Sequence, residues 1–93
     1  MGRDEDAGNA LEAAIRDLLA TRAVAGTICP SEAARKVALE RGSAEEGAWR
    51  ALMEPARTAA RRLVDRGEVE VRQRGRVVNP STAKGPVRIR RAR

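Results

Sequence analysis

The sequence predicts an α+β fold, and three observations support this prediction. Apolar residues recur at helical spacing in several segments before Gly67. After Gly67 their period changes from 3.6 to 2, the period of a strand with one buried face. The charge divides in a similar way, because residues 1–54 carry seven Arg/Lys and ten Asp/Glu whereas residues 55–93 carry twelve and three. One domain with a helical first part and a basic β part is therefore expected in 93 residues.

The first part is expected to contain three helices, near residues 9–22, 30–41 and 54–66. The first has an apolar stripe that runs from Leu11 to Leu19 at helical period. Pro30 suits the first turn of the second helix, since its missing N–H has no partner there in any case. The third helix is expected to begin at Glu54, with Pro55 in its first turn, and to end at Gly67.

The segments before and between these helices also have predicted structures. Residues 1–8 lack apolar periodicity and are expected to be a disordered acidic leader. Residues 25–29 form a short extended stretch that Pro30 stops. Ser43 and Glu46 have the spacing of a capping box, which predicts a short helix through Trp49. Trp49 is the only aromatic residue and is expected to be a packing anchor if it is buried.

The second part is expected to form strands near residues 68–73, 76–79 and 87–90. Apolar and charged residues alternate in Val69–Arg72, and Arg74-Gly75 suits a turn. Alternation places Arg88 and Arg90 on the face opposite Val87 and Ile89. Residues 91–93 are expected to be a basic tail, so that the folded domain covers residues 9–90.

This order of elements is typical of a winged helix-turn-helix, with three helices, a C-terminal β-hairpin wing and a last short strand. An unrelated three-helix bundle with a β-tail would give the same order. The short strand before the second helix favours the winged helix, because it suits pairing with the wing.

The chain also resembles a small bacterial family of winged-helix proteins, domain-of-unknown-function family 3253. The resemblance covers roughly residues 11–90 and implies a fold but no activity. It rests on the segments Ile28-Cys29-Pro30-Ser31-Glu32, Trp49-Arg50-Ala51-Leu52-Met53 with Arg57, Gly67-Glu68-Val69-Glu70-Val71, and Gly75…Asn79-Pro80…Gly85-Pro86-Val87-Arg88-Ile89-Arg90.

Several classes of function lack the residues they need. The chain has no histidine and one cysteine, Cys29, so it cannot build a zinc, haem or iron–sulfur site or a Ser–His–Asp triad alone. No cofactor, no metal and no enzymatic activity are therefore expected. Cys29 more often packs as a small hydrophobe than acts in redox chemistry. The absence of a spanning apolar run, a signal peptide and a disulfide pair predicts a cytoplasmic protein without membrane contact.

The third helix is a candidate recognition helix, because its exposed face is rich in arginine. Such a face enters the major groove of DNA, where arginine pairs with guanine. Its candidate DNA-binding residues are Arg50, Arg57, Thr58, Arg61 and Arg62. The alternative is an ordinary solvated face, in which Glu54–Thr58 and Arg61–Asp65 are surface pairs at i,i+4.

The wing and the last strand supply the second basic set. Arginine at a wing tip can lie along phosphates or enter a narrow minor groove. The candidate DNA-binding residues here are Arg72, Arg74, Arg76, Arg88 and Arg90. The alternatives are protection of an edge strand against aggregation and a disordered solubilising tail.

A small DNA-binding regulator is therefore the function that the sequence favours. The alternative, from another class, is a protein-interaction module or homodimer whose surface includes Trp49, Leu52 and Met53. RNA would suit the same charge, but apart from Trp49 the chain has no aromatic residue for base stacking. A compositional bias toward Ala and Arg would also raise the net charge, although it does not explain the asymmetry between the two halves.

Overall fold

The computed structural model describes residues 3–23, 26–42, 47–80 and 82–92. These residues form three α-helices, one short 3₁₀ helix and a four-stranded antiparallel sheet. The α+β fold is therefore confirmed, in a layout compatible with a winged helix. In chain order the elements are α1 (Arg3–Ala20), β1 (Thr27–Ile28), α2 (Pro30–Glu40), η1 (Ala48–Leu52), α3 (Met53–Asp65), β2 (Val69–Gln73), β3 (Arg76–Val77) and β4 (Arg88–Arg91).

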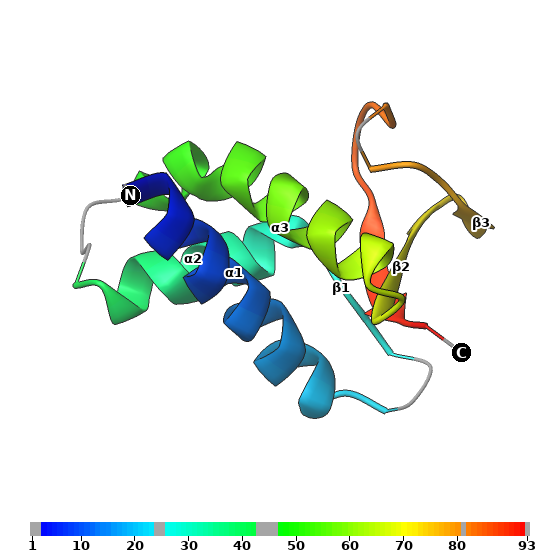
Figure 1. The fold of residues 1–93 in the computed structure, drawn as a ribbon, viewed down its shortest axis with the longest axis horizontal. Coiled ribbons are helices and arrows are strands. Elements are labelled where there is room, and N and C mark those ends of the chain that lie inside the picture. The colour runs from blue at the N-terminus through cyan, green and yellow to red at the C-terminus, as the bar shows by residue number, and fades with distance from the viewer. Residues whose placement is uncertain (1–2, 24–25, 43–46, 81, 93) are drawn as a thin grey trace.

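The helices pack against one another, and the sheet stands beside the C-terminal end of α3 (Figure 1). The strand order is β1-β4-β2-β3, and every neighbouring pair is antiparallel. The short strand β1 pairs with β4, with Ile28 opposite Ile89. This pairing joins the segment before α2 to the C-terminal strand, whereas the sequence predicted that this segment pairs with the wing hairpin. We call the β2–β3 hairpin with its connection to β4, residues 69–87, the wing.

Local signals in the sequence explain where α2 and α3 begin and end. Pro30 is the first residue of α2, and the Glu32 carboxylate accepts the Cys29 N–H at 2.7 Å. Pro55 lies in the first turn of α3, as expected. After α3, Gly67 adopts φ +76°, and the Glu68 N–H donates to the Leu63 carbonyl at 2.9 Å. This is a Schellman ending, which a left-handed glycine permits at no steric cost.

Helix and strand extend beyond both ends of the expected range of residues 9–90. The leader, residues 1–8, is helical from Arg3, and Ala7 is buried. The helix begins before its apolar stripe, and apolar periodicity does not detect such a start. The expected basic tail is also part of the fold, because Arg91 is the last residue of β4 and the Ala92 N–H donates to the Glu68 carbonyl. Residue 93 lies outside the described residues.

The region between α2 and α3 departs partly from its prediction. The capping box at residues 43–46 lies outside the described residues. The helix expected through Trp49 is the 3₁₀ helix η1, which leads directly into α3.

The core lies between the three helices and the inner face of the sheet. Its largest fully buried side chains are Leu11, Ile15, Ile28, Val37, Leu63, Val71 and Ile89. Buried alanines of α2 and α3 fill the space between the helices, which lets these helices approach closely. Trp49 is only half-buried and packs against the edge of this core. Glu12 of α1 is also buried, at 4% exposure.

Candidate nucleic-acid interface

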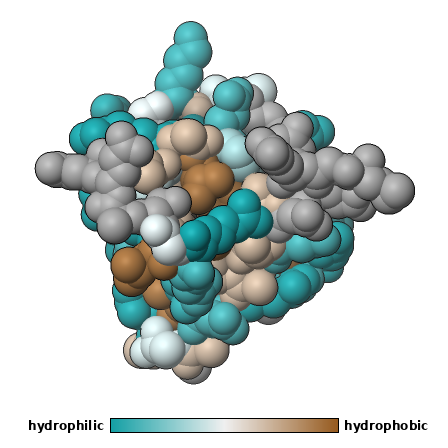
Figure 2. Space-filling model, turned by 90° about the vertical axis from the view of Figure 1, so that its left-hand side faces the viewer, coloured by the Kyte–Doolittle hydropathy of each residue, from teal (hydrophilic) through white to brown (hydrophobic). Residues whose placement is uncertain are grey.

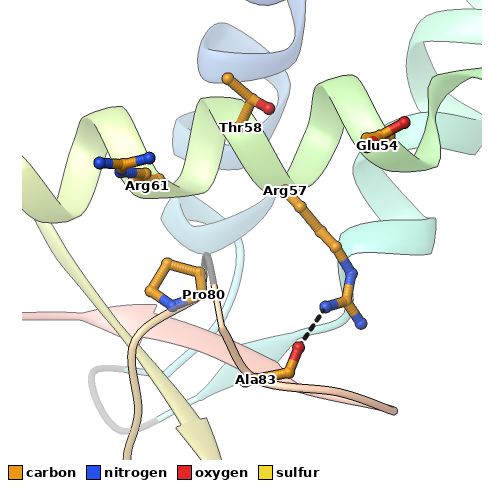
Figure 3. Close-up of a pocket in the computed structure, with 6 residues that line it drawn as sticks. All are labelled: Glu54, Arg57, Thr58, Arg61, Pro80 and Ala83. Atoms are coloured by element: carbon orange, nitrogen blue, oxygen red, sulfur yellow. Dashed lines mark hydrogen bonds between the residues drawn. The ribbon is translucent and has the colours of Figure 1, made fainter.

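One face of α3 meets the connection between β3 and β4 and forms a cleft of about 300 Å³. Figure 3 shows that α3 contributes one wall and the connection the other. Six residues line the cleft, namely Glu54, Arg57, Thr58, Arg61, Pro80 and Ala83. Three of them are candidate DNA-binding residues. The cleft therefore lies between the predicted recognition helix and the wing.

Arg57 does not extend freely into solvent. Its guanidinium donates to the Ala83 carbonyl at 3.1 Å and to the Gly85 carbonyl at 2.6 Å (Figure 3 shows the first bond). These bonds join residues 26 and 28 positions apart in the chain. Arg57 thus ties α3 to the wing.

Gln73, at the end of β2, binds the same segment of the wing. Its side-chain amide donates to the Lys84 carbonyl at 2.5 Å and to the Pro86 carbonyl at 3.2 Å. Arg57 and Gln73 together therefore bind all four consecutive carbonyls of residues 83–86, in alternation. We call these four hydrogen bonds the wing clasp. Gly85 has φ +87° in this segment, a conformation that favours glycine.

Arg62 of α3 and Arg66, which follows α3, contact α1. Arg66 donates to the Glu12 carboxylate at 2.5 Å, and Arg62 lies 3.7 Å from its other oxygen. Arg16 of α1 lies 3.9 Å from the same carboxylate. Three cations therefore surround one buried carboxylate, which explains how Glu12 can be buried. Arg62, a candidate for DNA contact, lies in this cluster and against Gly8.

The arginines on the outer face of the sheet are partly engaged as well. Arg72 pairs with Glu70 at 2.8 Å, and Arg90 lies 3.6 Å from the same carboxylate. Arg90 is buried at 8% exposure, which leaves little of it to contact a phosphate. Arg88 donates to the Thr27 hydroxyl at 2.8 Å and to Cys29 Sγ. These three side chains stabilise the pairing of β1, β2 and β4.

A second group of basic side chains is exposed and makes no hydrogen bond or ion pair with the described residues. On α3 and the wing this group consists of Arg61, Arg74, Arg76 and Lys84. The ion pair between Arg61 and Asp65 that an ordinary solvated face would favour is not formed at 4.0 Å or less. Arg74 adopts φ +53° and Gly75 φ +80°, the conformation of a type I′ hairpin turn. We call Arg61, Arg74, Arg76 and Lys84 the unpaired basic set.

The remaining candidates lie in two different settings. Thr58 is exposed and lines the cleft. Arg50 belongs to η1 and lies over the Trp49 ring, with its guanidinium carbon 5.1 Å from the ring centre. Arg35 of α2 lies over the same ring at 4.4 Å. Cation–π contacts thus cover Trp49, and Arg50 belongs to this group rather than to the cleft.

A protein-interaction module, the alternative function, would need a continuous exposed apolar surface around Trp49, Leu52 and Met53. Trp49, Leu52 and Met53 are half-buried against the core. Figure 2 looks at the end of the molecule opposite the wing and shows apolar surface broken up by polar side chains. Among the described residues, the exposed large apolar side chains are Leu39 of α2 and Val77 of β3, which belong to separate elements.

Two residues at this interface were not among the sequence candidates. Lys84 lies outside the strands that the sequence predicts and Gln73 ends one of them, so the sequence predicts no role for either residue. The glycine and proline around Lys84 were a signal for an ordered turn, but they did not show where that turn packs. Within the part of the chain that the structure describes, no group of His, Cys, Asp and Glu could hold a metal ion, and no helix is long and apolar enough to cross a membrane.

The family comparison agrees with the resemblance seen in the sequence. The model of the family described as "protein of unknown function (DUF3253)" matches residues 8–92. The chain therefore belongs to this family. No match is found among the curated proteins.

Proposed function

We propose that this member of the family is a DNA-binding domain that contacts duplex DNA through α3 and the wing. In this proposal the domain acts by binding and not by catalysis. It does so in the cytoplasm. The cleft side of α3 would face the major groove, and the wing would lie along the phosphates of the neighbouring backbone.

The unpaired basic set is the observation that carries this proposal. Arg57, Arg62, Arg66, Arg72, Arg88, Arg90 and Arg91 all have partners within the domain. Arg61, Arg74, Arg76 and Lys84 have none among the described residues, although Asp65 follows Arg61 by four positions on the same helix. Unpaired cations on one helix and the adjacent wing suit a polyanion, because each phosphate contact releases condensed counterions.

Duplex DNA fits this surface better than single-stranded nucleic acid. Single strands are bound largely by stacking of bases on aromatic side chains. The guanidinium groups of Arg35 and Arg50 lie over the ring of the only aromatic residue, Trp49, which does not line the cleft. Arginine and lysine without aromatic neighbours favour contact with backbone phosphates.

Salt dependence of binding tests the proposal directly. The affinity for a labelled random duplex of about 20 base pairs is measured by fluorescence anisotropy between about 50 and 200 mM NaCl. Four phosphate contacts give a log–log slope of roughly −3 to −4, which is about a hundredfold loss of affinity over this range. Arg76→Ala should reduce the magnitude of the slope by about 0.9.

Arg41→Ala is the matched control, since it removes an exposed arginine at the C-terminal end of α2 that makes no hydrogen bond or ion pair through its side chain with the described residues. It should leave the slope unchanged. No binding at about 50 mM salt, or a slope near zero, would overturn the proposal in favour of an interaction module.

A further inference from the structure

The wing clasp joins four consecutive carbonyls of the wing to side chains from two different elements. Arg57 of α3 binds the carbonyls of Ala83 and Gly85, while Gln73 of β2 binds those of Lys84 and Pro86. Along residues 83–86, the hydrogen-bond donor therefore alternates between a side chain of α3 and a side chain of the hairpin. Residues 84–86 make no backbone–backbone hydrogen bond with the described residues. The clasp thus supplies donors to carbonyls of this segment that no backbone N–H of the described residues binds.

The clasp lies next to three of the four unpaired cations. Lys84 is inside the clasped segment, and Arg74 follows Gln73 directly in the chain. Arg76 pairs with Gln73 across the hairpin. The hydrogen bonds of the wing clasp therefore also fix the backbone that carries Arg74, Arg76 and Lys84.

We propose that Arg57 and Gln73 are positioning residues, which hold the wing in place so that its unpaired cations meet phosphates without a cost of ordering. This inference rests on the proposed function and assigns Arg57 a role other than direct DNA contact. Both terminal nitrogens of Arg57 already donate to carbonyls, so a phosphate would have to displace two charge-assisted hydrogen bonds. A loop that is already ordered before binding binds more tightly, because it loses less conformational entropy when the complex forms.

The first arm of the test needs no DNA. Trypsin cleavage after Lys84 cuts inside the clasped segment, so its rate under native conditions measures how often the wing opens. Gln73→Ala and Arg57→Ala should each raise this rate by about fivefold or more, while Arg41→Ala should not change it. Arg57→Lys should restore little, since an ammonium lacks the fork that reaches two carbonyls together.

The second arm measures affinity and salt slope with the random duplex. Gln73→Ala removes no charge, so it should weaken binding by about five- to tenfold and leave the slope unchanged. Arg57→Ala should behave in the same way after correction for the charge effect seen with Arg41→Ala. The urea midpoint of each variant shows whether a loss of affinity reflects unfolding of the whole domain.

Two outcomes would overturn the inference. If Arg57→Ala leaves cleavage unchanged and reduces the slope by about 0.9, Arg57 is a direct phosphate contact. If Gln73→Ala opens the wing but binds as tightly as the parent, the order of the wing does not matter for affinity. If the parent protein binds no DNA, the proposed function fails together with this role in binding, whereas the cleavage arm still shows whether the clasp orders the wing.

Discussion

Arg66, the residue that follows α3, lies 2.5 Å from the Glu12 carboxylate of α1. The Glu12 side chain is only 5% exposed, whereas that of Arg66 is 53% exposed. The pair therefore joins a buried anion to a hydrated cation, with Arg62 and Arg16 as more distant partners. This contact holds the end of the candidate recognition helix against α1.

Glu12→Ala should lower the free energy of unfolding by about 1–3 kcal/mol, because it removes a charge-assisted hydrogen bond and leaves a cavity at the α1–α3 interface. The arginines are half exposed and can return to water, so the loss should stay below that of a fully buried ion pair. Urea denaturation measures the change. Asp17→Ala, at an exposed position of the same helix, should cost less than about 0.5 kcal/mol. Equal costs for the two variants would contradict this account.

A second ion pair makes stability depend on pH. Two hydrogen bonds of 2.8 Å from Arg16 hold the pKa of the Glu68 carboxyl below its ordinary value of 4.5. A lowered pKa in the folded state stabilises the fold at pH values above 4.5, and this contribution disappears as the pH falls through the folded-state pKa. The difference in urea midpoint between the parent and Glu68→Gln should therefore shrink below about pH 4.5. A difference that stays constant from pH 6 to 3 would show that the charge of Glu68 is not involved.

The sequence predicted those features that depend on local signals. Pro30 and Gly67 set the start of α2 and the end of α3. The change of period after Gly67 located β2, and the turn at Arg74-Gly75 follows from its composition. Each of these signals acts within a few residues, so a single sequence is enough to read it.

Features that depend on distant contacts were not predicted. The burial of Glu12 depends on Arg66, 54 residues further along the chain. Periodicity placed Arg57 on the exposed face of its helix, but it could not show that residues 83–86 return to that face. The N-terminal turns of α1 were missed for a similar reason, since Ala7 becomes buried only in the folded domain. Apolar periodicity therefore separates inner from outer faces, but it does not identify which outer side chains meet another segment.

The positive φ of Arg74 gives a prediction in which stability and binding change in opposite directions. A type I′ turn favours Asn or Gly at this position, because a larger L-residue is strained there. Arg74→Asn should therefore leave stability unchanged or raise it by about 0.5–1 kcal/mol. The same change should reduce the salt slope of DNA binding by about 0.9, since it removes one cation from the unpaired basic set.

Arg76→Asn is the matched control for Arg74→Asn. It removes an arginine from the neighbouring strand, where φ is not positive, so it should lower the slope without any gain in stability. Urea denaturation and the anisotropy titration are run on both variants. A clear loss of stability in Arg74→Asn would show that the arginine side chain contributes to the fold.

The last prediction separates contact with bases from contact with phosphates. Arg61 lies in the middle of α3 and lines the cleft, whereas Arg76 lies at the end of the hairpin. A helix inserted in the major groove would bring Arg61 to base edges, where a bidentate contact with guanine contributes about 1–3 kcal/mol of discrimination. A duplex selected from a random pool and an unselected duplex are therefore titrated with both variants. Arg61→Ala should lose about 1–3 kcal/mol on the selected duplex and much less on the other, whereas Arg76→Ala should weaken both to a similar extent. Similar losses on both duplexes for Arg61→Ala would mean that α3 contacts phosphates only, because a base contact is the one term here that depends on sequence.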